Sequence, residues 1–246
     1  MKLKEQIAET ELKLMLDSKQ ALQKKDALSN DLKTLFSIDD EPENTSIWYL
    51  ETPAQDLHKA NWSVRYRQFD SGGFDLTYKK RYSEKGYKAM LESNNAKMFA
   101  AEFTPKIDME YTKKYYSLSF ERVFTDMEEL TEPEAKRLAI LNSPPVFTDW
   151  KNKNFGFVNL CASSLLGPVA VITYKGQFED FEAKLEIWKL KDYLTEISFD
   201  VSTKKSTQLK RDLLKVLTDY KLLLTENQFK MDAILDCFSK NQPKNS

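Results

Sequence analysis

Charged side chains recur at every second position in several stretches of this sequence. In ETELK, residues 9–13, Glu9, Glu11 and Lys13 alternate with Thr10 and Leu12. Residues i and i+2 of a β-strand point to the same side, so these three charges would share one strand face. Such a face either meets water or lines an enclosed site, and only an enclosed face could do chemistry.

Four further stretches sort their polar side chains in the same way. SVRYRQ and DLTYKKRY place basic residues on one face, AKLEIWKL places a lysine and a glutamate there, and LTEISFDV places acidic residues there. The residues that share faces are Arg65 and Arg67; Thr77, Lys79 and Arg81; Lys184 and Glu186; and Glu196, Ser198 and Asp200. Any one such strand is most simply a half-exposed strand. Five together also allow a barrel whose charged faces point inward, with helices covering its apolar outer faces.

A polar lumen of this kind must hold both signs of charge, because burying one sign alone is too costly. Here some strands supply bases and others supply acids. Arginine and lysine bind phosphate oxygens, and carboxylates bind divalent metal ions. The pattern therefore favours a polyanion carried together with a divalent metal.

The overall composition excludes several other classes of function. The 37 basic and 38 acidic side chains give a formal net charge of -1, which is no general signal for nucleic acid or an anionic membrane. One histidine and two distant cysteines do not provide a zinc site, a Cys–His pair or a Ser–His–Asp triad. We find no signal peptide and no membrane-spanning stretch, so we expect a cytoplasmic protein.

The order of elements predicts an α+β fold. A strand over about 5–17 precedes an amphipathic helix over 18–36 that begins at Ser18 as N-cap. Short strands follow over 46–52, 61–69 and 73–82, and later over 168–176, 181–190 and 193–201, while Thr131 opens a helix over 131–141. Residues 96–104 fit a strand or a short helix, 110–124 fit a strand, and 206–238 are helical. Many short antiparallel strands with helices outside them indicate a sheet or a closed barrel.

Three segments together resemble the CYTH family, also called triphosphate tunnel metalloenzymes. ETELK matches the E-x-E-x-K signature of that family. YLETPAQDLHKANWSVRYR (49–67) is similar to the family segment in which an aromatic residue, a Thr-Pro and a later Leu precede an R-x-R strand. FDLTYKKRY (74–82) is similar to the next strand, of pattern T-x-K. The resemblance covers about residues 5–82 and extends over 165–201.

The resemblance implies an eight-stranded antiparallel β-barrel that forms a tunnel, and metal-dependent action on a triphosphate. Mg²⁺ or Mn²⁺ would be the cofactor. The implied metal ligands are Glu9, Glu11, Glu196, Glu186 and Glu102. Catalysis and triphosphate binding would fall to Lys13, Arg65, Arg67 and Lys79, with Arg81 and Lys175 as further substrate-binding residues.

This sequence departs from the family pattern at three places. Ser198 replaces the second acid of the closing E-x-E, and Val171, Ile172 and Thr173 stand where basic residues are usual. The middle acidic pair is reduced to Glu102. The region of about 105–145 has the character of an insertion, and we interpret residues 1–246 as a single CYTH-like domain with a helical segment at about 206–238.

We therefore expect a metal-dependent phosphohydrolase acting on inorganic triphosphate, thiamine triphosphate or a nucleoside triphosphate. Two alternatives stay open: a non-catalytic module that binds polyphosphate or nucleotide, and a class IV-type adenylyl cyclase. The expected partner is a small molecule that bears a triphosphate. We expect neither a membrane nor a specific nucleic acid as partner, and a homodimer stays open.

Overall fold

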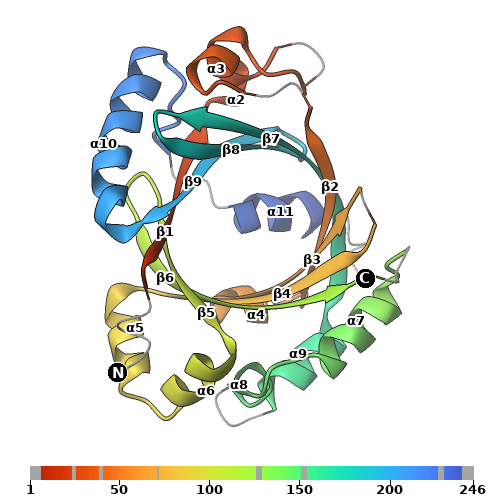
Figure 1. Cartoon of the computed structure of the whole chain (residues 1–246). Helices are drawn as coiled ribbons and strands as arrows, with labels where there is room; N and C mark the ends of the chain where they lie inside the picture. Colours follow the sequence, from red (N-terminus) through yellow and green to blue (C-terminus); the bar gives the residue numbers. More distant parts are fainter. Residues whose placement is uncertain are drawn as a thin grey trace.

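Nine strands close into a barrel in the part of the chain that the structure describes (Figure 1). The computed structural model describes residues 7–23, 26–38, 41–70, 72–125, 129–150, 154–226 and 230–239. The strands are β1 (Glu9–Leu16), β2 (Glu43–Glu51), β3 (Trp62–Phe69), β4 (Phe74–Tyr82), β5 (Thr104–Met109), β6 (Lys114–Phe124), β7 (Ser164–Phe178), β8 (Phe181–Lys189) and β9 (Leu194–Ser202). Around the barrel they follow the order β1-β5-β6-β4-β3-β2-β7-β8-β9.

The predicted α+β fold with a closed barrel is confirmed, with one strand more than expected. All neighbouring strands are antiparallel except β1 and β5, which pair in parallel with Glu11 opposite Asp108. β3 pairs with β4, the next strand along the chain, and there Arg65 lies opposite Thr77. Opposite residues of paired strands face the same side of a sheet, so these registers determine which side chains meet in the lumen.

Most of the helices lie outside the ring of strands, and one lies within it (Figure 1). They are α2 (Ser18–Ala21), α3 (Asn30–Leu35), α4 (Asp56–Lys59), α5 (Glu84–Leu91), α6 (Asn95–Glu102), α7 (Glu132–Leu141), α8 (Pro145–Thr148), α9 (Phe155–Ala162), α10 (Thr203–Asp219) and α11 (Lys230–Ser239). The helix inside the ring is α11. No described helix combines the length and the apolar character needed to span a membrane.

The apolar faces of β1 and β3 point outward and are covered by the outer helices. On β1, Leu12 and Leu14 are buried in a cluster that also contains Leu213 of α10 and Phe36 after α3. On the other side of the barrel the Tyr66 hydroxyl donates to the Ala135 carbonyl oxygen of α7 at 2.7 Å. Water therefore cannot reach these outer faces, and the charged faces of the same strands point into the lumen.

Two local predictions need correction. Residues 18–36 form α2 and α3 in place of one helix, and the N-cap of α2 is Asp17. Asp26 between them adopts φ 65°, which a continuing helix does not allow. The segment has the expected amphipathic character, since Leu28 and Leu32 are buried with Phe36.

The segment 105–145, predicted as an insertion, forms part of the barrel. It supplies β6 and nearly all of β5, with α7 outside them. Residues 96–104, which fitted a strand or a helix, fold mainly as α6. Pro105 lies near the start of β5 and has no N–H for a strand ladder, which is why this short strand is hard to recognise from sequence.

Candidate functional site

The inward strand faces line a cavity of about 900 Å³ inside the barrel. Ten of the eleven residues predicted for the site line this cavity: Glu9, Glu11, Lys13, Arg65, Arg67, Lys79, Arg81, Glu102, Glu186 and Glu196. Lys175 is not among the lining residues; its side chain is 69% exposed and pairs with Glu43. Glu102 reaches the cavity from the last residue of α6 and not from a strand.

One side of the cavity carries Arg65, Arg67, Lys79 and Arg81, which we call the basic wall. It is formed by β3 and β4. Arg65 Nη2 donates to Thr77 Oγ1 at 3.0 Å, and Asp75 lies 3.8 Å from Arg65 and 3.7 Å from Arg67. The Nε atoms of both arginines are buried and have no hydrogen-bond partner among the described residues. Buried N–H groups rarely lack partners, so this wall has donors available for an anion.

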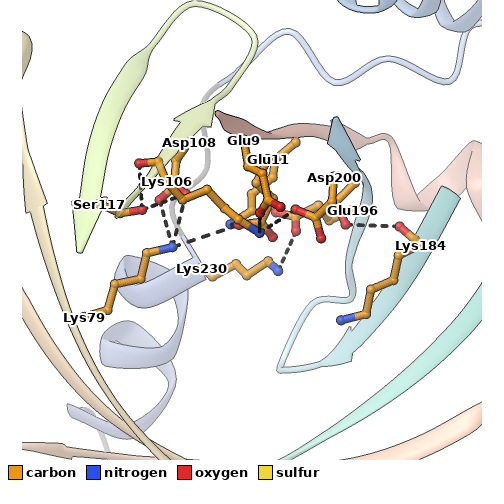
Figure 2. Close-up of polar contacts among 12 residues, drawn as sticks. Glu9, Glu11, Lys79, Lys106, Asp108, Ser117, Lys184, Glu196, Asp200 and Lys230 are labelled. Carbon is orange, nitrogen blue, oxygen red and sulfur yellow. Dashed lines mark hydrogen bonds and ion pairs between the residues drawn. The ribbon is translucent and has the colours of Figure 1, made fainter. Parts of the chain in front are cut away.

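Asp108 of β5 lies beside the basic wall, although no sequence pattern assigned it to the site. Its side chain is 2% exposed and lies 2.9 Å from Lys79 Nζ and 3.3 Å from Arg81 Nε. The Ser117 hydroxyl donates to it at 3.1 Å (Figure 2). Burial alone would raise the pKa of Asp108, but Lys13, Lys79 and Arg81 together hold it well below the usual value. Asp108 is therefore an anion that holds two of the cavity's cations in place.

Glu11 and Lys13 of β1 form a second charged pair, with Glu11 Oε2 and Lys13 Nζ at 2.7 Å. Burial raises the pKa of Glu11, but Lys13 and Lys79 outweigh it and lower this pKa to about 2. For Lys79 the balance is reversed: burial and the neighbouring Lys13 lower its pKa to about 8. Lys79 is therefore the cavity cation that can lose its proton in the mildly alkaline range.

The acidic wall consists of Glu186 on β8 and Glu196 on β9, which lie directly opposite each other in the strand register. Lys230 of α11 places its Nζ 2.8 Å from Glu186 and 2.6 Å from Glu196. Lys184 also pairs with Glu186 at 2.6 Å, and Trp188 Nε1 donates to Glu186 at 2.9 Å. Figure 2 shows Lys230 pointing toward Glu196, opposite the Lys79–Asp108 pair.

Lys106 of β5 lies between two acidic residues at the end of the barrel where β1 begins. Its Nζ is 2.6 Å from Asp200 and 4.0 Å from Glu9. Each of the four predicted strand carboxylates therefore lies within ion-pair distance of a lysine: Glu9, Glu11, Glu186 and Glu196.

These pairs bear on whether the cavity suits a divalent metal. Within the described ranges, no three acidic, histidine or cysteine side chains gather closely enough to hold a metal ion. The donor chemistry does fit, because carboxylate oxygens suit Mg²⁺ and Mn²⁺, and Mg²⁺ often takes one or two carboxylates together with phosphate oxygens and water. Two carboxylates of the acidic wall already share one cation, the Lys230 ammonium. A divalent ion fits there if that ammonium moves.

The sequence of the barrel also identifies its family. A model of the CYTH domain matches residues 8–142, which is more than half of the chain. The chain belongs to the CYTH domain family. The match ends before β7, so the closing strands and both C-terminal helices lie beyond it.

Several solved structures share this CYTH fold. A Hippeastrum protein described as an adenylyl cyclase with a dominant triphosphatase activity is 14% identical and covers 93% of this chain and 95% of its own, with a TM-score of 0.61. A Bacillus halodurans protein described as an adenylate cyclase is 13% identical and covers 92% of this chain and 98% of its own, with a TM-score of 0.55. At these identities the likeness establishes the fold alone. No curated protein sequence matches the chain.

Lys106, Asp108 and Lys230 are among the charged residues of this CYTH barrel that were missed from sequence. Lys106 and Asp108 do alternate in TPKIDM, the same signal that identified β1, but Pro105 and the shortness of β5 concealed it. Lys230 gives no such signal. It lies on a helix, and only the folded chain brings that helix to the acidic wall.

Proposed function

We propose that this CYTH barrel hydrolyses a small molecule bearing a triphosphate, with the help of Mg²⁺ or Mn²⁺. The observation that carries the proposal is the pair Arg65 and Arg67, whose buried Nε donors have no hydrogen-bond partner among the described residues and which line one cavity together with the acidic wall. Arginine matches phosphate oxygens with several donors at once. Membership of a generally metal-dependent family supports the metal requirement.

In this proposal the basic wall holds the phosphate chain. Arg65 and Arg67 donate to phosphoryl oxygens, and Lys79 and Lys13 add positive charge near the bridging atoms. The bound divalent ion would supply further neutralisation of phosphate charge, held by the carboxylates of Glu9, Glu11, Glu186 and Glu196. Phosphoryl transfer depends mainly on such positioning and charge stabilisation. We propose a cytoplasmic location for this activity.

The direct test is phosphate release by the purified protein from tripolyphosphate, thiamine triphosphate and ATP, each with Mg²⁺ or Mn²⁺. We expect turnover of at least one substrate, and at least 100-fold less in the Glu9→Gln/Glu11→Gln variant, because a lost charge-stabilising contact costs about that much. Equal rates in parent and variant would contradict the proposal. Cyclic AMP and pyrophosphate from ATP, without free phosphate, would establish a cyclase.

A binding module is the second candidate, because lysines already neutralise the carboxylates that would hold metal. Calorimetry with tripolyphosphate separates the two. Binding without any hydrolysis supports the module, and the absence of both counts against a triphosphate site.

Lys79 predicts a pH dependence of triphosphate binding. Its pKa of about 8 means that much of it is neutral at pH 8.5. A bound polyanion stabilises the charged form and raises this pKa, so binding at pH 8.5 should take up a proton at Lys79. We expect calorimetry in buffers of different ionisation enthalpy to show up to about three-quarters of a proton more uptake in the parent than in Lys79→Arg. The arginine stays charged at this pH. The difference between the two proteins also cancels the protons that tripolyphosphate itself exchanges, because both proteins bind the same ligand. The same uptake in both proteins would show that Lys79 does not titrate on binding.

A further inference from the structure

Helix α11 lies within the ring of strands (Figure 1). Ile234 is 0% exposed and belongs to an apolar cluster with Val169 and Val171 of β7 and Trp188 of β8. Strand register puts Val171 opposite Trp188, a residue that lines the cavity, so this cluster faces the lumen. The helix is therefore packed against the inside of the barrel.

This packing accounts for the part of β7 that lacks the basic residues usual in the family. Val169 and Val171, together with Ile47 of β2, give this side of the lumen an apolar surface, which the apolar face of α11 covers. Apolar surface gains free energy when it leaves water. A basic residue at position 171 would face Ile234 and its apolar neighbours, and it would not face a ligand.

Three side-chain contacts hold the first turn of α11. Lys230 bridges Glu186 and Glu196, its side chain is 21% exposed, and its Nζ lies 4.5 Å from the centre of the Trp188 ring. In the same turn, Asp232 Oδ1 lies 3.1 Å from Nε2 of His58, a residue of α4. Lys230 and Asp232 both line the remaining cavity, so this turn forms the boundary between the helix and the site.

We propose that Lys230 and a divalent cation exclude each other at Glu186 and Glu196, so that cation binding releases the first turn of α11. The inference rests on the proposed role of these two glutamates as cation ligands. One ammonium already lies within 2.8 Å of both carboxylates. A metal ion bound by both would come closer still to the same oxygens, and two cations cannot share that space at such distances. The protein thus carries its own competitor for the metal.

The first measurement is Mn²⁺ binding without any substrate, followed by the electron paramagnetic resonance signal of unbound Mn²⁺. Lys230→Met removes the ammonium and keeps an apolar stem over Trp188. Lys184→Met is the matched control, since it removes the same charge from the same partner, Glu186, but from strand β8. We expect Lys230→Met to bind Mn²⁺ at least tenfold more tightly than the parent, and Lys184→Met to change the affinity less than threefold.

The second measurement is hydrogen exchange in peptides that cover α11. In the parent, saturating Mn²⁺ should speed exchange in the first turns at least fivefold, whereas in Lys230→Met exchange should already be fast and respond little. Ile234→Ala loosens the helix without changing any charge, and it should also tighten Mn²⁺ binding, by about threefold. Similar Mn²⁺ affinities in Lys230→Met and Lys184→Met would overturn the proposal. So would slower or unchanged exchange of α11 with Mn²⁺ bound.

Neither measurement needs turnover, which separates the two proposals. If both measurements give the expected result and no triphosphate is hydrolysed, the competition between Lys230 and the metal is supported and the proposed hydrolase activity is refuted. If triphosphate is hydrolysed but hydrogen exchange in α11 does not respond to Mn²⁺, the proposed hydrolase activity is supported and the competition is refuted.

Discussion

Replacing Arg65 by alanine is expected to lower kcat/KM for the triphosphate substrate at least 100-fold. Arg65 is a half-buried residue of the basic wall, its buried Nε has no hydrogen-bond partner among the described residues, and Thr77 accepts from its Nη2. An oriented donor that meets charge developing in the transition state contributes about that factor. Steady-state phosphate release over a range of substrate concentrations measures it.

Two further variants make this result specific. Arg65→Lys keeps the charge but loses the planar set of donors, so we expect an intermediate loss of about tenfold or more. Arg122→Ala is the matched control, because Arg122 is an exposed arginine of the neighbouring β6 that lies opposite the outward-facing Leu76. It should keep the parent activity. A loss in Arg122→Ala as large as in Arg65→Ala would argue against a basic wall that binds substrate.

Asp108→Asn is expected to cause the largest loss of stability among single changes in the cavity. Asp108 is almost completely buried between Lys79 and Arg81. Removing one partner from a buried ion pair leaves uncompensated charge, which costs about 3 kcal/mol or more. In a chain of this length that corresponds to a melting temperature lower by about 6–12 °C. Thermal and urea unfolding at pH 7 would measure the change.

The control for this change is Asp200→Asn. Asp200 also pairs with a cavity lysine, Lys106 at 2.6 Å, but its side chain is 65% exposed. Exposed pairs contribute little, so this variant should lose less than about 1 kcal/mol. The double variant Asp108→Asn/Lys79→Met should lose less than the sum of its two single variants, because the second change removes the unpaired lysine. Equal stability losses in Asp108→Asn and Asp200→Asn would refute the assignment.

The effect of Asp108 should also depend on pH. Although burial raises the pKa of Asp108, Lys13, Lys79 and Arg81 hold it well below its ordinary value of 3.8. A carboxyl with a lowered pKa in the folded state stabilises the fold fully above the unfolded pKa and loses this contribution as pH falls. The stability difference between the parent and Asp108→Asn should therefore be constant above about pH 5 and shrink below about pH 4.

The charged faces of the barrel were predictable from sequence because a strand has a period of two. Glu9, Glu11 and Lys13 line the cavity while Leu12 and Leu14 are buried outside it, as the alternation in ETELK allowed. Alternation alone does not say which face is enclosed. The family motif resolved that choice, and the long outer helix α10 and its leucines supply the physical reason.

What sequence could not provide is which elements meet across the barrel. Asp108 enters the site through the parallel pairing of β1 with β5, and such a pairing leaves no local pattern. The same holds for Lys230, whose helix shows an apolar face without showing what it packs against. The sequence likewise did not reveal that Val171 faces a helix. The packing of α11 against β7 explains why a valine stands where a basic residue was expected.

The position of β1 has a consequence for how the chain folds. β1 lies between β5 and β9, and its Glu9 pairs with Ser202 almost two hundred residues later. Contacts so distant in sequence demand a large loss of chain entropy before they contribute any stability, and they slow folding. During synthesis both edges of β1 are unpaired until β5 is made, and one edge stays unpaired until β9 follows. Its alternating charges then serve a different purpose, because charged side chains on an open edge discourage pairing with other chains.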